Sequence, residues 1–208
     1  MAERGRPRSF DRQAVLERAM RVFWEKGYAG ASMSDLTSAM GINSPSLYAA
    51  FGCKEALFRE AIALYMETEG ASIWSGIPTA PSARSGIETM LRATAEAFSR
   101  PGRPRGCLIT LEAARAGGSG ESLEPELRRL RTCNIDTLRL RLDRAIEEGE
   151  IQKSADTDAI ASFYTTMQQG MAIRARDGAS REALLTIAEY GMRAWDGFVP
   201  SRTDIDPT

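Results

Sequence analysis

The sequence predicts an all-α protein of about nine helices, in which an N-terminal three-helix bundle with a helix-turn-helix precedes a C-terminal helical bundle. Three observations predict this class. Apolar residues recur at intervals of three and four along most of the chain, which is the period of an amphipathic helix. No alternating strand pattern outweighs these helices, and no internal repeat is present. Within residues 32–57, Gly41 separates two short periodic segments, as in two helices joined by a tight turn.

The composition excludes several classes of protein. The 208 residues are 43% apolar and 26% charged, as in ordinary globular proteins. No stretch approaches the roughly 20 apolar residues that cross a bilayer, and the N-terminus lacks the apolar run of a secretory signal, so we expect a cytoplasmic protein without membrane contact. Histidine is absent, and the three cysteines form no CxxC pair. We therefore expect no metal, no disulfide framework and no cofactor.

Charge is distributed unevenly along the chain. Residues 1–54 carry eight basic and five acidic side chains, although the net charge of the whole chain is −1. A basic N-terminal part on an acidic remainder suits phosphate contact by one end, while an excess this small also arises by chance. Arg4, Arg6 and Arg8 lie in a Gly- and Pro-rich arm, which either follows a DNA groove or is a solvated tail.

The first three helices are marked by their capping residues. Asp11 is an N-cap for the first helix, and Gly27 is placed to end it in a left-handed conformation. Ser32 and Asp35 have the spacing of a capping box that begins the second helix. Asn43 is an N-cap for a third helix of roughly seven or eight residues, about two turns long.

The second and third helices have one apolar and one polar face. Leu36, Ala39, Leu47 and Phe51 are predicted to point inward. Between them lie small or hydrogen-bonding residues: Ser34, Thr37, Ser38, Asn43, Ser44, Ser46 and Tyr48. A helix pair that buries one side and offers such side chains on the other suits the DNA major groove.

Tyr48 and Lys54 are candidate phosphate contacts. An exposed phenol beside small polar residues is a good donor to a phosphate oxygen. Lys54 begins the fourth helix, where a lysine opposes the helix dipole and a bound anion relieves the conflict. The alternative for Lys54 is an ordinary surface ion pair.

The remaining helices follow in order. They are expected at residues 54–74, 85–98, 107–116, 123–148, 156–176 and 181–195. The last two carry apolar residues over much of their circumference, with glycines that permit close approach, so we expect them to pair two copies of the chain. The alternative is that both cover only their own core. The predicted dimer residues are Phe163, Gly170, Met171, Leu184, Ile187, Ala188, Gly191 and Trp195.

Residues 10–58 resemble the tetracycline-repressor (TetR) family of one-component bacterial regulators. The matching segments are VFWEKGY and ASMSDLTSAMGINSPSLYAAFGCKEALF. The resemblance implies an all-helical homodimer with a DNA-binding domain at 1–54, a ligand-binding and dimerisation domain at 55–208, and a palindromic double-stranded operator as partner. It also implies that Tyr48 and Lys54 contact phosphate. Cys53 departs from the family, which commonly has serine, asparagine or aspartate at this cap.

The predicted DNA-binding residues are Ser32, Ser34, Asn43, Ser44, Pro45, Ser46, Tyr48 and Lys54. The resemblance further implies an effector pocket, for which the candidates are Trp74, Met90, Phe98, Cys107, Leu111, Tyr164 and Met167. The alternative, which the residue types favour for each of them, is plain core. We expect an apolar or aromatic effector, or an electrophile that reacts with Cys107. Arg103 and Arg105 lie just before Cys107, and their positive charges are expected to favour the reactive thiolate form.

The sequence therefore predicts a transcriptional regulator, with repression taken from the family. Two alternatives remain: a helix-turn-helix that contacts protein, and an all-helical enzyme. The polar outward face of the third helix favours DNA over a protein partner. Against an enzyme, pairs of carboxylates such as Glu147 and Glu150 lie on charged helix ends without histidine or a glycine-rich phosphate loop.

Overall fold

A computed structural model describes residues 10–115 and 122–199, and the predicted arm with Arg4, Arg6 and Arg8 lies outside these ranges. Every regular element in the described ranges is helical. The elements are α1 (Arg12–Gly30), α2 (Met33–Met40), α3 (Ser44–Phe51), α4 (Lys54–Tyr65), the π-helical turn η1 (Met66–Gly70), α5 (Ala71–Trp74), α6 (Ala83–Ser99), α7 (Leu108–Ala114), α8 (Glu124–Glu147), α9 (Thr157–Arg176), α10 (Arg181–Arg193) and α11 (Trp195–Phe198).

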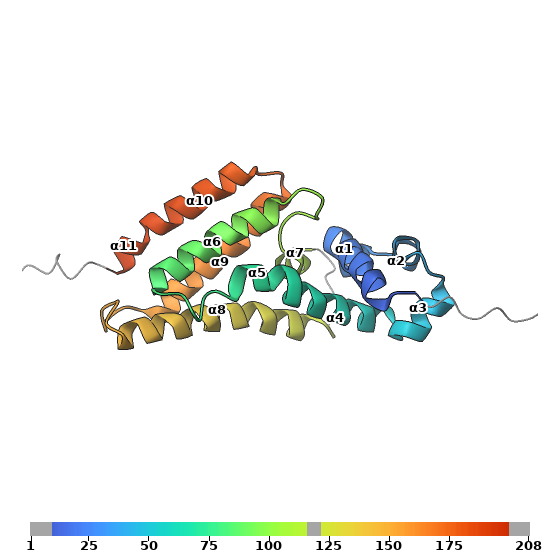
Figure 1. Cartoon of the computed structure of the whole chain (residues 1–208), viewed down its shortest axis with the longest axis horizontal. Coiled ribbons are helices and arrows are strands. Elements are labelled where there is room, and N and C mark those ends of the chain that lie inside the picture. The colour runs from blue at the N-terminus through green and yellow to red at the C-terminus, as the bar shows by residue number, and fades with distance from the viewer. Residues whose placement is uncertain (1–9, 116–121, 200–208) are drawn as a thin grey trace, which may run out of the picture.

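The molecule is elongated, with a head at one end and a larger body at the other (Figure 1). The head consists of α1, α2 and α3, and the body of the elements from α4 onward. The segment α4–η1–α5 leads from the head into the body (Figure 1), and Arg59 of α4 pairs there with Glu126 of α8. None of the described helices is long and apolar enough to cross a membrane.

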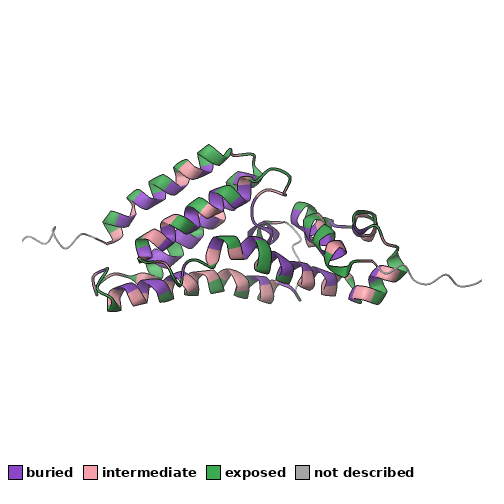
Figure 2. Cartoon of the chain, in the orientation of Figure 1, coloured by how far each residue is buried: buried purple, intermediate pink, exposed green. Residues whose placement is uncertain are grey.

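The head is held together by an apolar centre to which each of its helices contributes. Phe23 from α1, Leu36 from α2 and Leu47 from α3 are each 0% exposed. Phe23 meets Phe58 of α4 edge-on, with the ring centroids 4.9 Å apart. The buried faces of α1 and α4 continue into the body without a break (Figure 2), so the head is anchored mainly by α4.

The predicted helix starts are confirmed. Asp11 accepts hydrogen bonds from the first-turn amides of α1, and Asn43 accepts one from the Ser46 amide at 2.9 Å. Ser32 and Asp35 form a reciprocal capping box. Each cap satisfies amides that have no partner within the helix, which is why these short helices begin where the sequence predicts.

Two details of the head differ from the prediction. Gly27 has the expected positive φ of +78°, but the chain makes a kink there and continues as one more helical turn to Gly30. Ala39 is exposed, and Met40 occupies the inward position four residues after Leu36. Positions i+3 and i+4 both lie near the face of Leu36, and packing of the larger side chain places Met40 inward instead of Ala39.

The predicted single helix over residues 54–74 is interrupted by a π-turn at Met66–Gly70. The carboxylate of Glu69 in this turn is buried, and Arg100 and Arg103 each lie 3.5 Å from it. The paired charges allow a carboxylate to sit inside the body. A π-turn adds one residue to a helical turn, so the residues after it are rotated about the helix axis relative to those before it.

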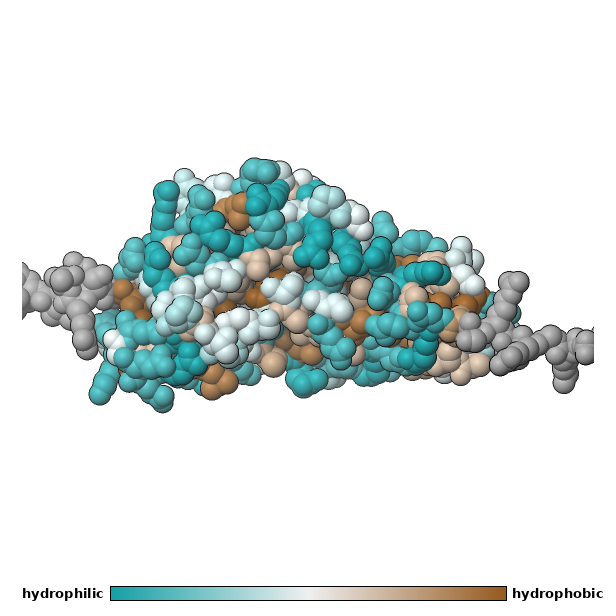
Figure 3. All heavy atoms as spheres, in the orientation of Figure 1, coloured by the Kyte–Doolittle hydropathy of each residue, from teal (hydrophilic) through white to brown (hydrophobic). Residues whose placement is uncertain are grey.

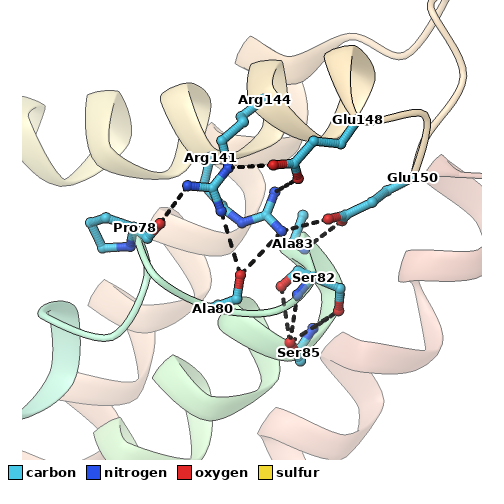
Figure 4. Close-up of polar contacts among 9 residues, drawn as sticks. All are labelled: Pro78, Ala80, Ser82, Ala83, Ser85, Arg141, Arg144, Glu148 and Glu150. Atoms are coloured by element: carbon cyan, nitrogen blue, oxygen red, sulfur yellow. Dashed lines mark hydrogen bonds and ion pairs between the residues drawn. The ribbon is translucent and has the colours of Figure 1, made fainter.

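The end of the body farthest from the head is fastened by an arginine–carboxylate network, termed here the distal clamp (Figure 4). Arg141 of α8 is 3% exposed and pairs with Glu150 at 2.6 Å. Glu150 also accepts the Ala83 amide at 2.7 Å, which caps the start of α6. Arg144 donates to the carbonyl of Pro78 at 2.6 Å. The clamp thereby fixes the loop between α5 and α6 to the end of α8.

Candidate nucleic-acid interface

Helix α3 presents a short polar surface at the outer end of the head. Leu47 and Phe51 are buried, which fixes the rotation of the helix about its axis. Tyr48 points outward and is 48% exposed. Of the other predicted contacts on this helix, Asn43, Ser44 and Pro45 are exposed and Ser46 is half-buried. The outward face is therefore made of small or hydrogen-bonding side chains, as base and phosphate contact requires.

Helix α2 contributes differently. Ser34 is exposed, whereas the Ser32 hydroxyl is already engaged with the Asp35 carboxylate at 2.7 Å. Lys26 of α1 pairs with Asp35 at 2.5 Å. The hydrogen bonds from Lys26 and Ser32 hold the pKa of the Asp35 carboxyl well below its usual range. The structure thus gives Ser32 a capping role, and its contact with DNA remains a prediction.

The turn between α2 and α3 depends on Gly41 and Arg18. Gly41 has φ +70° and ends α2 in the left-handed region that favours glycine. Arg18 of α1 donates to the carbonyl of Met40, the last residue of α2, at 3.2 Å. Sequence reasoning found Gly41 but missed Arg18, because a bond between residues 22 positions apart leaves no local pattern.

Lys54 lies at the junction of head and body. Its ammonium nitrogen is 4.5 Å from the centroid of the Tyr28 ring, and the side chain is half-buried. Partial burial lowers the pKa of Lys54, and the carboxylate of Glu112 opposes that shift. In this conformation Lys54 interacts with the protein, so contact with a phosphate requires the flexible side chain to swing outward.

The residue before Lys54 is the unusual cap noted in the sequence. The Cys53 sulfur accepts the Ala56 amide at 3.4 Å, and Cys53 is exposed. Sulfur is a weaker acceptor than a hydroxyl or carboxylate oxygen. The start of α4 is therefore capped, but weakly.

A buried polar contact joins the body to the back of the head. Arg115 follows α7 and donates to the carbonyls of Trp24 and Glu25 at 3.2 and 2.9 Å. Its partner is the carboxylate of Glu112, 3.2 Å away and 1% exposed. Arg176 of α9 also donates to the Glu25 carbonyl. Residues from α7 and α9 thus hold the last turns of α1, and this junction had no signal in the sequence.

Behind this junction, the body contains a small cavity between the end of α4 and η1, α5, α6, α7, α8 and α9, with a volume of about 20 Å³. Three of the predicted effector residues line it: Trp74, Phe98 and Cys107. The other four do not. Met90 and Leu111 are buried in the core, and Tyr164 is buried with its hydroxyl donating to the Gly191 carbonyl at 3.1 Å. Met167 packs against Gly191.

Cys107 is buried at the edge of this cavity. It follows Gly106, where φ is +80° and a Cβ atom would lie 2.5 Å from the carbonyl oxygen of Ala172. Only glycine allows this approach of the chain to α9. Burial, together with the neighbouring Cys107, raises the pKa of Tyr65 well above its usual value.

The two arginines near Cys107 are engaged elsewhere. Arg103 pairs with Glu69 at 3.5 Å, and Arg105 donates to the carbonyl of Ala179 at 2.8 Å. The expectation that both guanidinium groups favour a thiolate is therefore not supported by the geometry, because each has another partner.

The predicted dimer residues fall into two groups. Met171, Leu184, Ala188, Gly191 and Trp195 are buried within the chain itself. Phe163 and Gly170 are exposed and Ile187 is half-buried, and a Cβ atom at Gly170 would meet nothing within 4 Å. The outward faces of α9 and α10 also expose two large apolar residues that the sequence analysis did not select, Ile173 and Tyr190.

The described surface of the body also has two open hollows, one between α6 and α10 and one beside the loop that precedes α6. On the face drawn in Figure 3, hydrophobic residues occupy small areas separated by hydrophilic ones. Among the described residues, no group of three or more histidine, cysteine, aspartate or glutamate side chains is placed to hold a metal ion.

Two family models match the chain. "Bacterial regulatory proteins, tetR family" matches residues 15–61, which span most of α1, all of α2 and α3, and the first part of α4. "Tetracyclin repressor-like, C-terminal domain" matches residues 84–189, from α6 into α10. The two matches together cover both the head and the body.

Individual proteins are similar over almost the whole chain. The HTH-type transcriptional repressor ComR of Escherichia coli K12 is 34% identical over 94% of this chain and 94% of its own length. BdcR, another HTH-type transcriptional repressor of that strain, is 28% identical over 88% of each chain. A cysteine mutant of the TetR-family regulator CifR, solved with 26-bp double-strand operator DNA, is 43% identical, with a TM-score of 0.87 over 92% of this chain and all of that chain.

Proposed function

The chain belongs to the TetR family of bacterial regulatory proteins, and we propose that it is a homodimeric transcriptional repressor that is released from a palindromic operator by a small molecule. Residues 1–54 form the DNA-binding domain in this proposal, and residues 55–208 bind the effector and the second copy. The protein acts in the cytoplasm, where it meets DNA, and its work is binding rather than catalysis.

One observation carries the DNA-binding part of the proposal. Helix α3 is fixed by the buried Leu47 and Phe51, and its opposite face exposes a small polar surface ending in Tyr48. Such a helix enters the major groove with Asn43, Ser44, Pro45 and Ser46 near base edges and backbone, while the Tyr48 hydroxyl donates to a phosphate. The operator-bound CifR structure supports this use of the fold. A protein-contact surface would carry exposed apolar anchors instead.

The dimer uses the outward faces of α9 and α10. Phe163 and Ile173 on α9 and Tyr190 on α10 are large, apolar and exposed in the single chain. Gly170 leaves open space beside them for close approach of a second helix. Two heads held in this way read two half-sites about one DNA turn apart, which is why the operator is palindromic.

A mobility-shift titration tests the DNA-binding proposal. The DNA is the region flanking the protein's own coding sequence, titrated at about 50 and 200 mM salt. We expect a retarded complex whose affinity falls steeply with salt, because phosphate contacts release counterions. Tyr48→Phe removes one hydroxyl from an exposed ring, so we expect a loss of about threefold to tenfold without loss of stability. The matched control is Ser75→Ala, which removes an exposed hydroxyl from the body, away from the head and from the outward faces of α9 and α10.

The effector acts through the cavity in the body. Support comes from its position between η1, α7 and α9, because these elements lead to α4 and to the junction with α1. Cys107 offers a second route, in which an electrophile modifies the thiol at the cavity edge. If Cys107→Ser leaves operator release by electrophiles and oxidants unchanged, the covalent route is excluded and the non-covalent one remains.

A further inference from the structure

The cavity in the body has a lining of two kinds. Apolar and aromatic side chains come from Trp74, Phe98 and Ile109. Hydrogen-bonding side chains come from Arg131, Asn134 and Gln168. Arg131 and Asn134 are three residues apart on α8, so they share a helix face. Gln168 of α9 is only 3% exposed, so its amide is placed in the interior beside the cavity.

Arg131 has a donor that is not used. Its Nη2 donates to Glu124 Oε1 at 3.0 Å. Its Nη1 is buried and finds no hydrogen-bond partner among the described residues. A guanidinium group can only donate, and a buried donor without an acceptor costs free energy. Nη1 is therefore a donor that an acceptor group placed in the cavity can use.

We propose that the cavity binds a small molecule with an apolar, partly aromatic body and an acceptor oxygen, in a carboxylate or carbonyl group, that receives the free Nη1–H of Arg131. The aromatic body packs against Trp74 and Phe98. Only the statement that this ligand is the effector rests on the proposed function. Binding of the ligand to the cavity does not depend on DNA binding.

The ligand has to enlarge the cavity. A volume of about 20 Å³ holds roughly one water molecule. Met66 and Trp74 line the cavity and are half-buried, so these two side chains can move toward solvent. Met66 is unbranched and adaptable, and it begins the π-turn η1. Entry of the ligand therefore displaces the segment that connects the body to α4 and the head.

Isothermal titration of the full chain without DNA tests the proposal with three probes of one shape. These are 3-phenylpropanoate, 4-phenyl-2-butanone and butylbenzene, which are saturated in the side chain and do not alkylate Cys107. We expect the carboxylate, the ketone or both to bind at least about tenfold tighter than butylbenzene. If the carboxylate binds more tightly, the preferred acceptor group is anionic, and if the ketone binds more tightly, it is neutral.

Two variants assign the preference to the guanidinium group. Arg131→Met keeps an apolar stem and removes the donors, so we expect it to reduce binding of the oxygen-containing probes to the level of butylbenzene. Arg129→Met is the matched control, since Arg129 is an exposed arginine on the same helix and does not line the cavity. It should leave all three affinities unchanged.

A third variant keeps the test decisive if Arg131→Met does not fold. Glu124→Gln removes the carboxylate that now competes for Arg131, and we expect it to tighten the carboxylate probe several-fold relative to the ketone. The proposal is overturned if no probe binds, if all three bind equally, or if the preference survives in Arg131→Met. Equal effects of Glu124→Gln on carboxylate and ketone also overturn it. Failure of operator binding alone would instead count against the proposed function.

Discussion

The head and the cavity in the body are built in opposite ways. The head is assembled from local pieces: Ser32 and Asp35 close one cap, Asn43 closes another, and Leu47 and Phe51 are one helical turn apart. The cavity is assembled from seven elements, and its lining residues range from Tyr65 to Gln169 along the sequence. Because the head is built from residues close together in the sequence, the shape of its surface depends on few contacts with distant segments. Construction from distant segments gives a site that changes whenever one segment moves.

The same contrast appears in the polar contacts. The head carries its ion pairs near the surface, as between Lys26 and Asp35. The body also has exposed ion pairs, such as Arg181 with Glu96, but in addition it buries one member of a pair at Glu112 beside the head and at Arg141 in the distal clamp. Buried charges are costly to separate, so the two places fix the body at both ends. The segment from α4 to α5 lies between these fixed places, and the cavity lies against its π-turn.

The largest effect is expected in the distal clamp. Arg141→Met leaves Glu148 and Glu150 without their buried partner, and we expect it to reduce the free energy of unfolding by about 2 kcal/mol. This is less than for a wholly buried pair, because the carboxylates are partly exposed. Chemical denaturation followed by circular dichroism measures the change.

Arg139→Met is the control for Arg141→Met. Arg139 lies on the same helix with its own carboxylate partners, but its side chain is 36% exposed, so we expect a change within about 0.5 kcal/mol. Equal losses of stability in Arg141→Met and Arg139→Met would contradict the claim that the buried pairs of the distal clamp stabilise this end of the body.

An intermediate effect is expected at the start of α3, the helix proposed to enter the major groove. Asn43→Ala removes the acceptor for the Ser46 amide, which destabilises α3 by about 1 kcal/mol. Because α3 is only two turns long, we expect the loss to appear as weaker operator binding together with a lower melting temperature. Asn43→Ser retains a capping oxygen and should restore the melting temperature. A melting temperature that stays low in Asn43→Ser would show that capping is not the cause.

The smallest effect is expected at the junction of head and α4. Cys53→Ser replaces a weak sulfur acceptor by a hydroxyl at the N-cap, and we expect a gain of about 0.5 kcal/mol in the free energy of unfolding. The melting temperature measures this gain, with substitution of the exposed Cys133 on α8 (Cys133→Ser) as control. A loss of stability would mean that the thiol has a packing role that its exposure does not show.

The sequence predicted the head in detail because its signals are local. Asp11, Ser32 and Asn43 act on amides two or three residues away, and the structure confirms all three caps. The two errors are small ones. The helix continues for one turn past Gly27, and Met40 replaces Ala39 in the core, since a one-residue choice between small and large apolar residues depends on packing.

The body could be predicted only as a set of helices. The π-turn at Met66–Gly70 left no pattern, because its residues are all compatible with an α-helix. Apolar periodicity identified candidates such as Met90 and Tyr164, but it did not distinguish residues that face a cavity from those that face the core. Arg131 was not selected at all. Its unused donor becomes visible only when α8 is placed beside α7 and α9.

The central claim is that two copies of α3 read one operator, and selection from a pool of random double-stranded DNA tests it most directly. Full-length protein is incubated with the pool, bound DNA is amplified, and the enriched sequences are determined. The account predicts a palindrome with two half-sites about one helical turn apart. It also predicts that Ser46→Ala changes the base preference within each half-site but not their spacing. Absence of any enriched sequence, or enrichment of a single half-site without dyad symmetry, would contradict the account.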